Sequence, residues 1–444
     1  MNIVLLSGGS GKRLWPLSND IRSKQFIKIF RKEDGTYESM VQRMYRKIRE
    51  VDTDATITIA TSKTQVSAIH NQIGTDVGIS VEPCRRDTFP AIALASAYLR
   101  DVQGVGLDEP VIVCPVDPYV ETDYFEKLEE LSNAVAKTSA NLTLIGMEPT
   151  YPSEKYGYII PKTKDDHSSV SAFKEKPDKE TAQEYIAQGA LWNAGIFGFK
   201  LRYMLEKTEE ILGTTDYKTL FADYANLTKI SFDYAVVEKE NSIDVLRFAG
   251  AWKDLGTWNT LTEAMEETTI GHAILNETCS NVHILNEMDV PILAMGLKDV
   301  VISASAEGIL VSDKEQSSYI KPYVDSIDQQ IMFAEKSWGE FRVLDVEPES
   351  LTIRVTLNEG HGMNYHSHEH RDEIWTVLSG EGCALVDGRK ITVKAGDVIS
   401  IPAGSKHTVF AFTRLQIMEV QLGTDIRVTD KIKQEAPANW PPEQ

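Results

Sequence analysis

The segment that begins at Asn2 constrains the fold more than any other part of the chain. Ile3–Leu6 is a short apolar run, typical of a buried parallel strand. It ends in Ser7-Gly8-Gly9-Ser10-Gly11, and Lys12 and Arg13 follow at once. Glycines after a strand let the backbone turn sharply and bring its N–H groups close to an anion, whose charge the two cations would stabilise. We interpret this segment as a nucleotide-phosphate loop. A purely structural turn is the alternative.

The loop fits neither of the common nucleotide-binding patterns. The pattern GxxxxGK[ST] fails because Arg13 follows Gly11-Lys12, and GxGxxG fails because no glycine lies at the required spacing.

The following residues extend the loop into a longer motif. The run from Ser7 to Ser18 reads SGGSGKRLWPLS, and Lys24-Gln25-Phe26 comes shortly after it. This motif resembles the signature of sugar-1-phosphate nucleotidylyltransferases, and its Trp-Pro-Leu-Ser ending resembles the mannose-1-phosphate guanylyltransferase branch. Where that family usually has Pro-Lys-Gln, this chain has Ser23-Lys24-Gln25. The resemblance implies that the nucleotide is bound by Ser7, Gly8, Gly9, Ser10, Gly11, Arg13 and Lys24, with catalytic roles for the last two.

Composition narrows the class of protein. With 66 acidic and 46 basic residues the net charge is −20, which argues against a general nucleic-acid or anionic-membrane binder. Four scattered cysteines without a CxxC pair indicate reduced thiols, and no apolar stretch approaches membrane-spanning length. We expect a cytoplasmic enzyme of two or three domains.

The pattern of strands and helices divides the 444 residues into three regions. Residues 1–265 alternate apolar runs with amphipathic stretches, which predicts an α/β, Rossmann-like domain with a mixed, mostly parallel sheet. Residues 266–328 consist of short β-branched segments and resemble the left-handed β-helix-like connector of the guanylyltransferase branch. Residues 329–444 alternate strands with Gly-rich turns, as expected of a small β-barrel.

Two aspartates are candidate magnesium ligands. Asp117 comes just after the apolar run Val111–Pro115, at the end of a strand where α/β sheets bind ligands. From position alone, capping of the next helix explains it equally well. The resemblance favours the metal, because Pro115-Val116-Asp117-Pro118 corresponds to the family's Pro-Ala-Asp-His. Asp254 lies in Trp252-Lys253-Asp254-Leu255-Gly256-Thr257-Trp258, which resembles the motif that carries the other magnesium ligand; a Gly turn between core tryptophans is the structural alternative.

The remaining motifs of the first region resemble the family's sugar and nucleotide sites. By this resemblance Gly157, Glu175 and Asn193 contact the sugar, and Lys176 contacts its phosphate and acts in catalysis. We interpret Asp233 and Glu238 as structural or near the sugar. The loop from Glu82 to Ala91 resembles Glu-Pro-x-Gly-Arg-Asn-Thr-Ala-Pro-Ala and implies nucleotide contacts from Glu82, Arg86 and Asp87. This loop departs from the family pattern at Arg85, Asp87 and Phe89, and the Asp117 motif departs from it at Pro118. The motifs therefore leave undecided which sugar and which nucleotide base the protein binds.

The C-terminal region carries an independent motif. Gly360, His366, His368, Glu373 and Gly380 fit the cupin pattern G(x)5HxH(x)4E(x)6G, and Gly396, Pro402, Gly404 and His407 fit most of the second cupin motif. Residues two apart on a strand point to the same side, so His366 and His368 can converge. With Glu373 and His407 they would hold zinc or another divalent transition metal.

A second alignment of this region is possible. The segment from His368 to Trp375 resembles the signature of type II phosphomannose isomerases, in which His370 competes for a ligand position and Arg371 matches the arginine implicated in isomerisation.

Together these features predict an enzyme that transfers a nucleotidyl group from GTP to mannose 1-phosphate with Mg²⁺, with or without mannose-6-phosphate isomerase activity. We expect a homodimer. The alternatives are another sugar or nucleotide and a non-catalytic sugar-nucleotide sensor.

Overall fold

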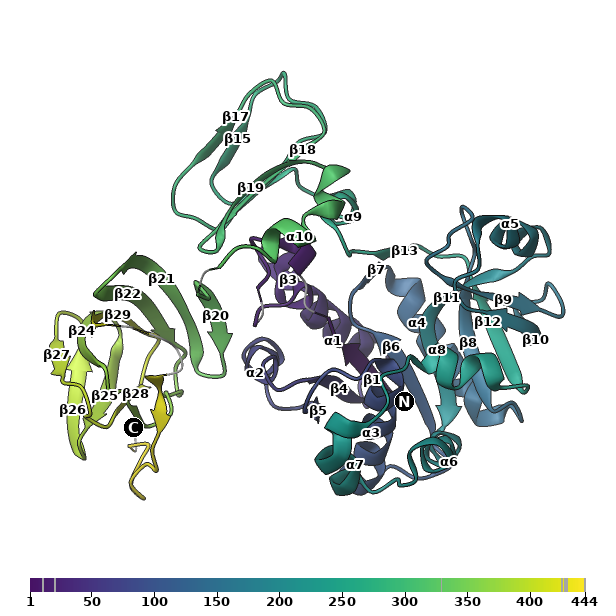
Figure 1. Cartoon of the computed structure of the whole chain (residues 1–444), viewed down its shortest axis with the longest axis horizontal. Coiled ribbons are helices and arrows are strands. Elements are labelled where there is room, and N and C mark those ends of the chain that lie inside the picture. Colours follow the sequence, from purple (N-terminus) through teal and green to yellow (C-terminus); the bar gives the residue numbers. More distant parts are fainter. Residues whose placement is uncertain (10–11, 20, 329, 425, 427–429, 443–444) are drawn as a thin grey trace. The chain divides into compact units, whose positions relative to one another are not determined.

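The computed structural model describes all residues except 10–11, 20, 329, 425, 427–429 and 443–444 (Figure 1). Contacts divide the chain into two compact units. The first comprises Met1–Ser10, Lys24–Val66 and Ile73–Glu266, and the second comprises Gly11–Ser23, Ser67–Gln72 and Glu267–Gln444. No helix among the described residues is long and apolar enough to cross a membrane.

The first unit is built on a nine-stranded mixed sheet. Pairing is parallel from β5 through β4 and β1 to β6, and between β8 and β12, whereas β11 runs antiparallel to both β6 and β8. The two apolar runs expected to be strands, Ile3–Leu6 and Val111–Pro115, lie in β1 and β6. In sheet order the strands are β5 (Gly78–Glu82), β4 (Thr56–Ser62), β1 (Asn2–Ser7), β6 (Pro110–Pro115), β11 (Leu191–Lys200), β8 (Leu142–Met147), β12 (Ile243–Phe248), β10 (His167–Lys174) and β9 (Gly157–Pro161).

Helices cover both faces of this sheet. A Cβ atom at Gly198 of β11 would lie 2.7 Å from Val135 of α4, whereas Phe197 and Phe199 contact Phe232 of α8 with ring centroids 4.6 and 6.2 Å apart. Neighbouring residues of a strand point to opposite faces, so α4 and α8 lie on opposite sides. The helices that begin in this unit are α1 (Met40–Val51), α2 (Val66–Ile73), α3 (Thr88–Asp101), α4 (Thr122–Lys137), α5 (Lys179–Ala187), α6 (Leu201–Leu212), α7 (Tyr217–Asp223), α8 (Phe232–Ala235) and α9 (Trp258–Glu263).

Short elements complete the first unit. Strand β7 (Pro118–Val120) pairs with β13 (Trp252–Asp254), and β2 (Lys28–Arg31) pairs with β3 (Tyr37–Ser39). The 3-10 turns are η2 (Lys24–Phe26), η3 (Tyr224–Asn226) and η4 (Val237–Lys239).

The second unit begins with a connector of short, mostly parallel strands. One sheet has the order β14 (Thr269–Ile270), β16 (His283–Asn286), β18 (Val300–Ser305) and β19 (Gly308–Asp313), and β15 (Ala273–Leu275) pairs in parallel with β17 (Ile292–Ala294). Turn η5 (Gln316–Tyr319) and helix α10 (Lys321–Val324) follow. The N-terminal segment with η1 (Lys12–Leu14) packs here: Arg22 makes two 2.8 Å contacts with Glu287, and Ser305 Oγ donates to the Pro16 carbonyl.

The cupin barrel consists of two antiparallel sheets around an apolar core that includes Val355, Trp375 and Ile417. One sheet has the order β20 (Phe333–Lys336), β21 (Gly339–Glu347), β22 (Ser350–Leu357), β29 (Leu415–Gly423), β24 (Arg371–Ser379) and β27 (Val398–Ile401). The other has the order β26 (Arg389–Lys394), β25 (Glu381–Val386), β28 (His407–Ala411), β23 (His366–Ser367) and β30 (Ile432–Lys433).

Candidate active site and metal centre

A cavity of about 410 Å³ opens where the four parallel strands of the first unit end. Its size lies in the range of small-molecule sites, and this edge of an α/β sheet is where ligands bind. Each strand contributes to the wall, and so do Gln65 and Lys229, which lie outside both the four strands and the predicted motifs. The lining residues are Leu6, Ser7, Gly8, Gly9, Ala60, Ser62, Gln65, Glu82, Cys84, Arg85, Asp87, Thr88, Ala91, Pro115, Asp117 and Lys229.

A buried polar network holds the start of the glycine loop. Gln25 Nε2 donates to Ser7 Oγ at 3.0 Å, and Thr61 Oγ1 donates to Gln65 Oε1 at 2.7 Å. Ser7 Oγ in turn donates to Gln65 Oε1 at 3.3 Å. Gly9 has a φ of 114°, a conformation that a side chain would strain. Ser7, Gly8 and Gly9 therefore present a fixed backbone to the cavity.

The other loop residues are placed differently. Ser10 and Gly11 lie outside the described residues. Arg13 is exposed on η1, which belongs to the second unit, and it is not among the residues that line the cavity.

The loop before α3 reaches the cavity through Arg85 and Asp87. The Arg86 guanidinium, predicted to contact nucleotide, instead donates to the Ala225 carbonyl, and Arg86 is absent from the cavity lining. Asp87 caps α3 by accepting from the Thr88 N–H at 2.8 Å, with a φ of 70°. Glu82 accepts from the Tyr224 hydroxyl at 2.7 Å, and burial raises the pKa of its carboxyl.

The two candidate magnesium ligands, Asp117 and Asp254, both contact the ammonium group of Lys24. Lys24 Nζ lies 2.7 Å from Asp117 Oδ2 and 3.4 Å from Asp254 Oδ1. Burial lowers the pKa of Lys24, but the two carboxylates outweigh it and the net direction is upward. Helix α4 has Glu121 as its N-cap residue, so Asp117 does not cap it. Two carboxylates that meet at Lys24, one of which (Asp117) lines the cavity, suit Mg²⁺, which is bound by one or two carboxylates plus substrate phosphates.

The predicted sugar residues also come together. A Cβ atom at Gly157 would lie 2.4 Å from Glu175 Oε2 and 3.3 Å from Asn193 Cβ, so these three positions are in close contact. Lys176 Nζ pairs with Glu175 Oε1, while the buried Glu175 Oε2 has no hydrogen-bond partner among the described residues. An unpaired buried acceptor is costly, and a ligand hydroxyl would satisfy it.

Asp233 joins this cluster. Its Oδ1 accepts from Asn193 Nδ2 at 2.6 Å, and Asn193 Oδ1 accepts from the Gly195 N–H. Burial, reinforced by the charge of Glu175, raises the pKa of Asp233 to about 6. Glu238 accepts from the Glu175 N–H at 3.1 Å, so it positions Glu175.

Aromatic side chains link the predicted sugar residues to the segment that carries Asp254, a candidate magnesium ligand. The ring of Tyr156, next to Gly157, lies 5.0 Å from that of Trp192 and 5.6 Å from that of Trp252, two residues before Asp254. Burial, with contributions from Tyr151 and Asp254, raises the pKa of Tyr156 above its ordinary value.

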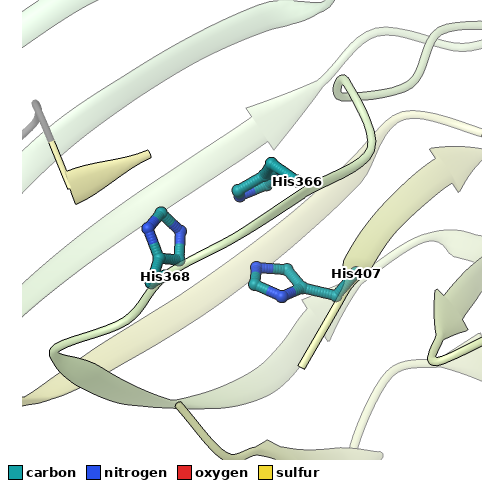
Figure 2. Close-up of side chains that lie close together, drawn as sticks. All are labelled: His366, His368 and His407. Carbon is teal, nitrogen blue, oxygen red and sulfur yellow. The ribbon is translucent and has the colours of Figure 1, made fainter. Parts of the chain in front are cut away.

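Three histidines converge in the cupin barrel of the second unit (Figure 2). The candidate ligand atoms of His366, His368 and His407 all lie within 4.8 Å of one another, and all three side chains are buried. His366 lies directly opposite His407 in the pairing of β23 with β28. Each Nδ1 faces a backbone carbonyl, those of Asn364, Asp430 and Ser405 at 2.6, 3.0 and 2.9 Å. A carbonyl only accepts, so Nδ1 carries the proton and each Nε2 can bind a metal, although Arg371 Nη2 lies 2.9 Å from His368 Nε2 and would have to yield to an ion there.

Glu373 of β24 faces two of these histidines. Its Oε1 lies 3.1 Å from His368 Nε2 and its Oε2 3.3 Å from His407 Nε2. Arg371 Nε and Trp375 Nε1 donate to Glu373 at 3.1 and 3.0 Å. Burial lowers the pKa of His368 to about 4 and that of His366 to about 2, so both imidazoles are neutral, the form that binds metal. His370 is exposed, and the geometry therefore favours His366 over His370.

A cavity of about 330 Å³ adjoins this cluster. Apolar residues such as Trp338 and Phe341 form part of its wall, and its basic residues are Lys336, Arg371, Lys431 and Lys433. Glu419 also lines it, and burial raises the pKa of this carboxyl to about 8. None of these residues except Arg371 was predicted. Alternate residues of β29 (Leu415, Ile417, Glu419 and Gln421) are buried, which places Glu419 inside the barrel. This alternation in the sequence could have predicted that Glu419 points inward.

Comparison with known proteins identifies the class. Residues 2–270 match the Nucleotidyl transferase family and residues 353–419 match the Cupin domain family. The first match spans more than half of the chain, so the protein belongs to the nucleotidyl transferase family and carries a cupin domain. The resemblance stated from the sequence is confirmed, as is the predicted fold class of α/β domain and cupin barrel.

Similar proteins extend over nearly the whole chain. It is 26% identical to a mannose-1-phosphate guanylyltransferase of Klebsiella pneumoniae, and the alignment covers 97% of this chain and 98% of the relative. It is 29% identical to the xanthan biosynthesis protein XanB of Xanthomonas campestris, with 97% of each covered. The crystal structure of a mannose-1-phosphate geranyltransferase from Thermus thermophilus has 26% sequence identity to this chain and superposes with a TM-score of 0.60. The superposition covers 73% of this chain and 98% of that chain.

Proposed function

We propose that the first unit transfers a nucleotidyl group from GTP to mannose 1-phosphate, giving GDP-mannose and pyrophosphate. The observation that carries this proposal is that Asp117 and Asp254 meet at the ammonium group of Lys24. Asp117 also lines the cavity whose wall includes the glycine loop. The choice of mannose and guanine is supported by the name of the similar protein of Klebsiella pneumoniae, a mannose-1-phosphate guanylyltransferase.

The reaction makes one bond and breaks one bond. An oxygen of the sugar phosphate attacks the α-phosphorus of the triphosphate, and the bond from the α-phosphorus to the bridging oxygen breaks, so that pyrophosphate leaves with the electron pair. No protein nucleophile is needed, so catalysis depends on positioning and on charge stabilisation.

The chain's own residues divide this work. The backbone of Gly8 and Gly9 cradles phosphate oxygens, and Lys24 and Lys176 neutralise the two anionic substrates. Glu175, positioned by Glu238, accepts a hydrogen bond from a sugar hydroxyl, and Asn193, held by Asp233, contacts the same sugar. Bound Mg²⁺ on Asp117 and Asp254 would screen the repulsion between the substrates and stabilise the charge that develops on the phosphates.

A panel of substrates tests this function. Pyrophosphate release is measured with each common nucleoside triphosphate against mannose, glucose and other sugar 1-phosphates. GTP with mannose 1-phosphate is expected to give the highest kcat/KM. A preference of about tenfold, or 1.4 kcal/mol, for another pair would change the sugar or base but keep the reaction class. No pyrophosphate release with any pair would support the sugar-nucleotide sensor instead.

A second activity is proposed for the cupin, namely interconversion of mannose 6-phosphate and fructose 6-phosphate. The observation that favours it is a cavity in which His366 and Arg371 face a wall that also carries Lys336, Lys431 and Lys433. Cationic side chains suit a phosphate group, and zinc or another divalent transition metal held by the histidines and Glu373 would polarise a sugar carbonyl. A coupled isomerase assay on the metal-loaded protein tests this proposal.

A further inference from the structure

The ammonium group of Lys24 lies where the two metal carboxylates meet. Its Nζ makes contacts of 2.7 Å with Asp117 Oδ2 and 3.4 Å with Asp254 Oδ1. The Lys24 side chain is only 13% exposed, whereas those of Asp117 and Asp254 are 31% and 51% exposed. The lysine therefore reaches the carboxylates from the protein side, and the carboxylates face outward beyond it.

A divalent cation needs the same oxygen atoms. Mg²⁺ binds carboxylate oxygens at about 2.0–2.1 Å and demands near-ideal octahedral geometry. An ammonium group at hydrogen-bond distance from both carboxylates adds like charge next to any ion that they hold. At these separations the repulsion is large, because the lysine is mostly shielded from water.

We propose that Lys24 closes the divalent-cation site of the free protein, so that an entering cation must displace its ammonium group, and that a triphosphate eases this displacement by offering the ammonium group other anionic partners. This inference rests on the proposed function, because it takes Asp117 and Asp254 to be the cation site. Its consequence is an order of events: the free protein binds Mg²⁺ weakly, and cation and nucleotide enter together.

Titration of the full chain with Mg²⁺ alone, followed by calorimetry, tests the proposal. Mg²⁺ prefers oxygen ligands, so the histidine cluster of the cupin contributes little to the signal. Lys24→Met removes the charge but keeps the length of the side chain, and it is expected to bind Mg²⁺ about tenfold more tightly than the wild type without nucleotide. Lys253→Met is the matched control, because Lys253 neighbours Asp254 in sequence but pairs with Glu263 at 3.5 Å; its affinity should equal that of the wild type.

Two further results bear on the assignment. Adding Asp254→Asn to Lys24→Met should abolish the gain in Mg²⁺ affinity. Equal or weaker Mg²⁺ binding by Lys24→Met, with the fold retained by circular dichroism, would overturn the proposal.

If Lys24→Met does not fold, chemical labelling of the lysines in the wild-type protein tests the same proposal. Reductive methylation of lysines is measured by mass spectrometry with and without saturating Mg²⁺, and the extent at Lys24 should rise severalfold with Mg²⁺ while that at Lys253 stays constant. Unchanged labelling of Lys24 would refute the closed site. Neither measurement uses turnover, so failure of the proposed function, seen as no pyrophosphate release by the wild type, is a separate result.

Discussion

Pro118 lies directly opposite Asp254 in the antiparallel pairing of β7 with β13. This ribbon places Asp117, the residue before Pro118, beside a carboxylate from a distant part of the chain. Proline has no N–H to donate and is tolerated in edge strands, so the departure from the family's histidine at this position keeps the ribbon intact.

The first prediction concerns these two carboxylates. Asp117→Asn and Asp254→Asn should each lower pyrophosphate release by about 10²–10³-fold, because an amide is a poor magnesium ligand and one charge contact of this kind is worth about 2.7–4 kcal/mol in the transition state. Steady-state assays check this, with circular dichroism to confirm the fold. Asp108→Asn is the control, since Asp108 is exposed and pairs with Arg202 at 3.0 Å. Turnover close to that of the wild type in either variant would remove that aspartate from the metal site.

The second prediction concerns the contact between Gly157 and Glu175. In Gly157→Ala the new methyl group would lie 2.4 Å from Glu175 Oε2, so the carboxylate must move. We expect a rise of about tenfold or more in KM for the sugar phosphate, with little change in KM for the triphosphate. Gly106→Ala is a suitable control, because its methyl group would meet only the end of the Glu109 side chain, at 3.2 Å. Equal effects on both KM values would contradict a sugar-side role.

The third prediction is a pH dependence that arises from Asp233. Its pKa is raised to about 6 in the folded state, against an ordinary value of 3.8, so the folded state binds the proton more tightly than the unfolded state. This group therefore lowers the free energy of unfolding as pH rises from about 4 to about 6, by about 1–3 kcal/mol. Asp233→Asn should raise Tm relative to the wild type at pH 8, and the difference should vanish near pH 4. Thermal melts at both pH values measure it; a Tm difference that does not depend on pH would show that the carboxyl titrates normally.

The fourth prediction separates the two alignments of the cupin motif. His407→Ala removes one of three converging imidazoles and should abolish stoichiometric binding of zinc or another divalent transition metal, measured by elemental analysis after reconstitution. His370→Ala, at the exposed competing position, should bind metal like the wild type. Pyrophosphate release should change little in either variant, because the metal cluster belongs to the second unit. Equal loss of metal in both variants would favour the alignment through His370.

Residues tied to local patterns were predictable from the sequence. The apolar run at 111–115 became β6, and Asp117 lies at its end by the cavity, because parallel strands present their carboxyl ends to one edge of a sheet. The spacing of two between His366 and His368 placed both rings on one side of the chain. Only the motif pointed to Asp254, because no local pattern reports a long-range pairing such as that of β13 with β7.

The roles of other site residues could not be predicted, because they depend on the direction in which a single side chain points. Arg85 and Arg86 are chemically alike neighbours, but one lines the cavity and the other bonds the Ala225 carbonyl. Gln65 and Lys229 reach the cavity from segments without any motif, so their contribution depends on tertiary packing alone. The inner-face position of Glu419 could have been found from the alternation along its strand, but its raised pKa follows from burial near the charge of Glu373, which the sequence does not report.

The candidate ligands of the cupin come from both of its sheets, since His366 and His407 lie on β23 and β28 and Glu373 lies on β24. A bound ion would therefore act as a cross-link in a barrel whose cysteine, Cys383, forms no disulfide. Unlike a disulfide, this cross-link strengthens with the concentration of free metal, by about 2.7 kcal/mol at one hundred times the dissociation constant. The thermal resistance of the barrel would then vary with the supply of metal in the surroundings.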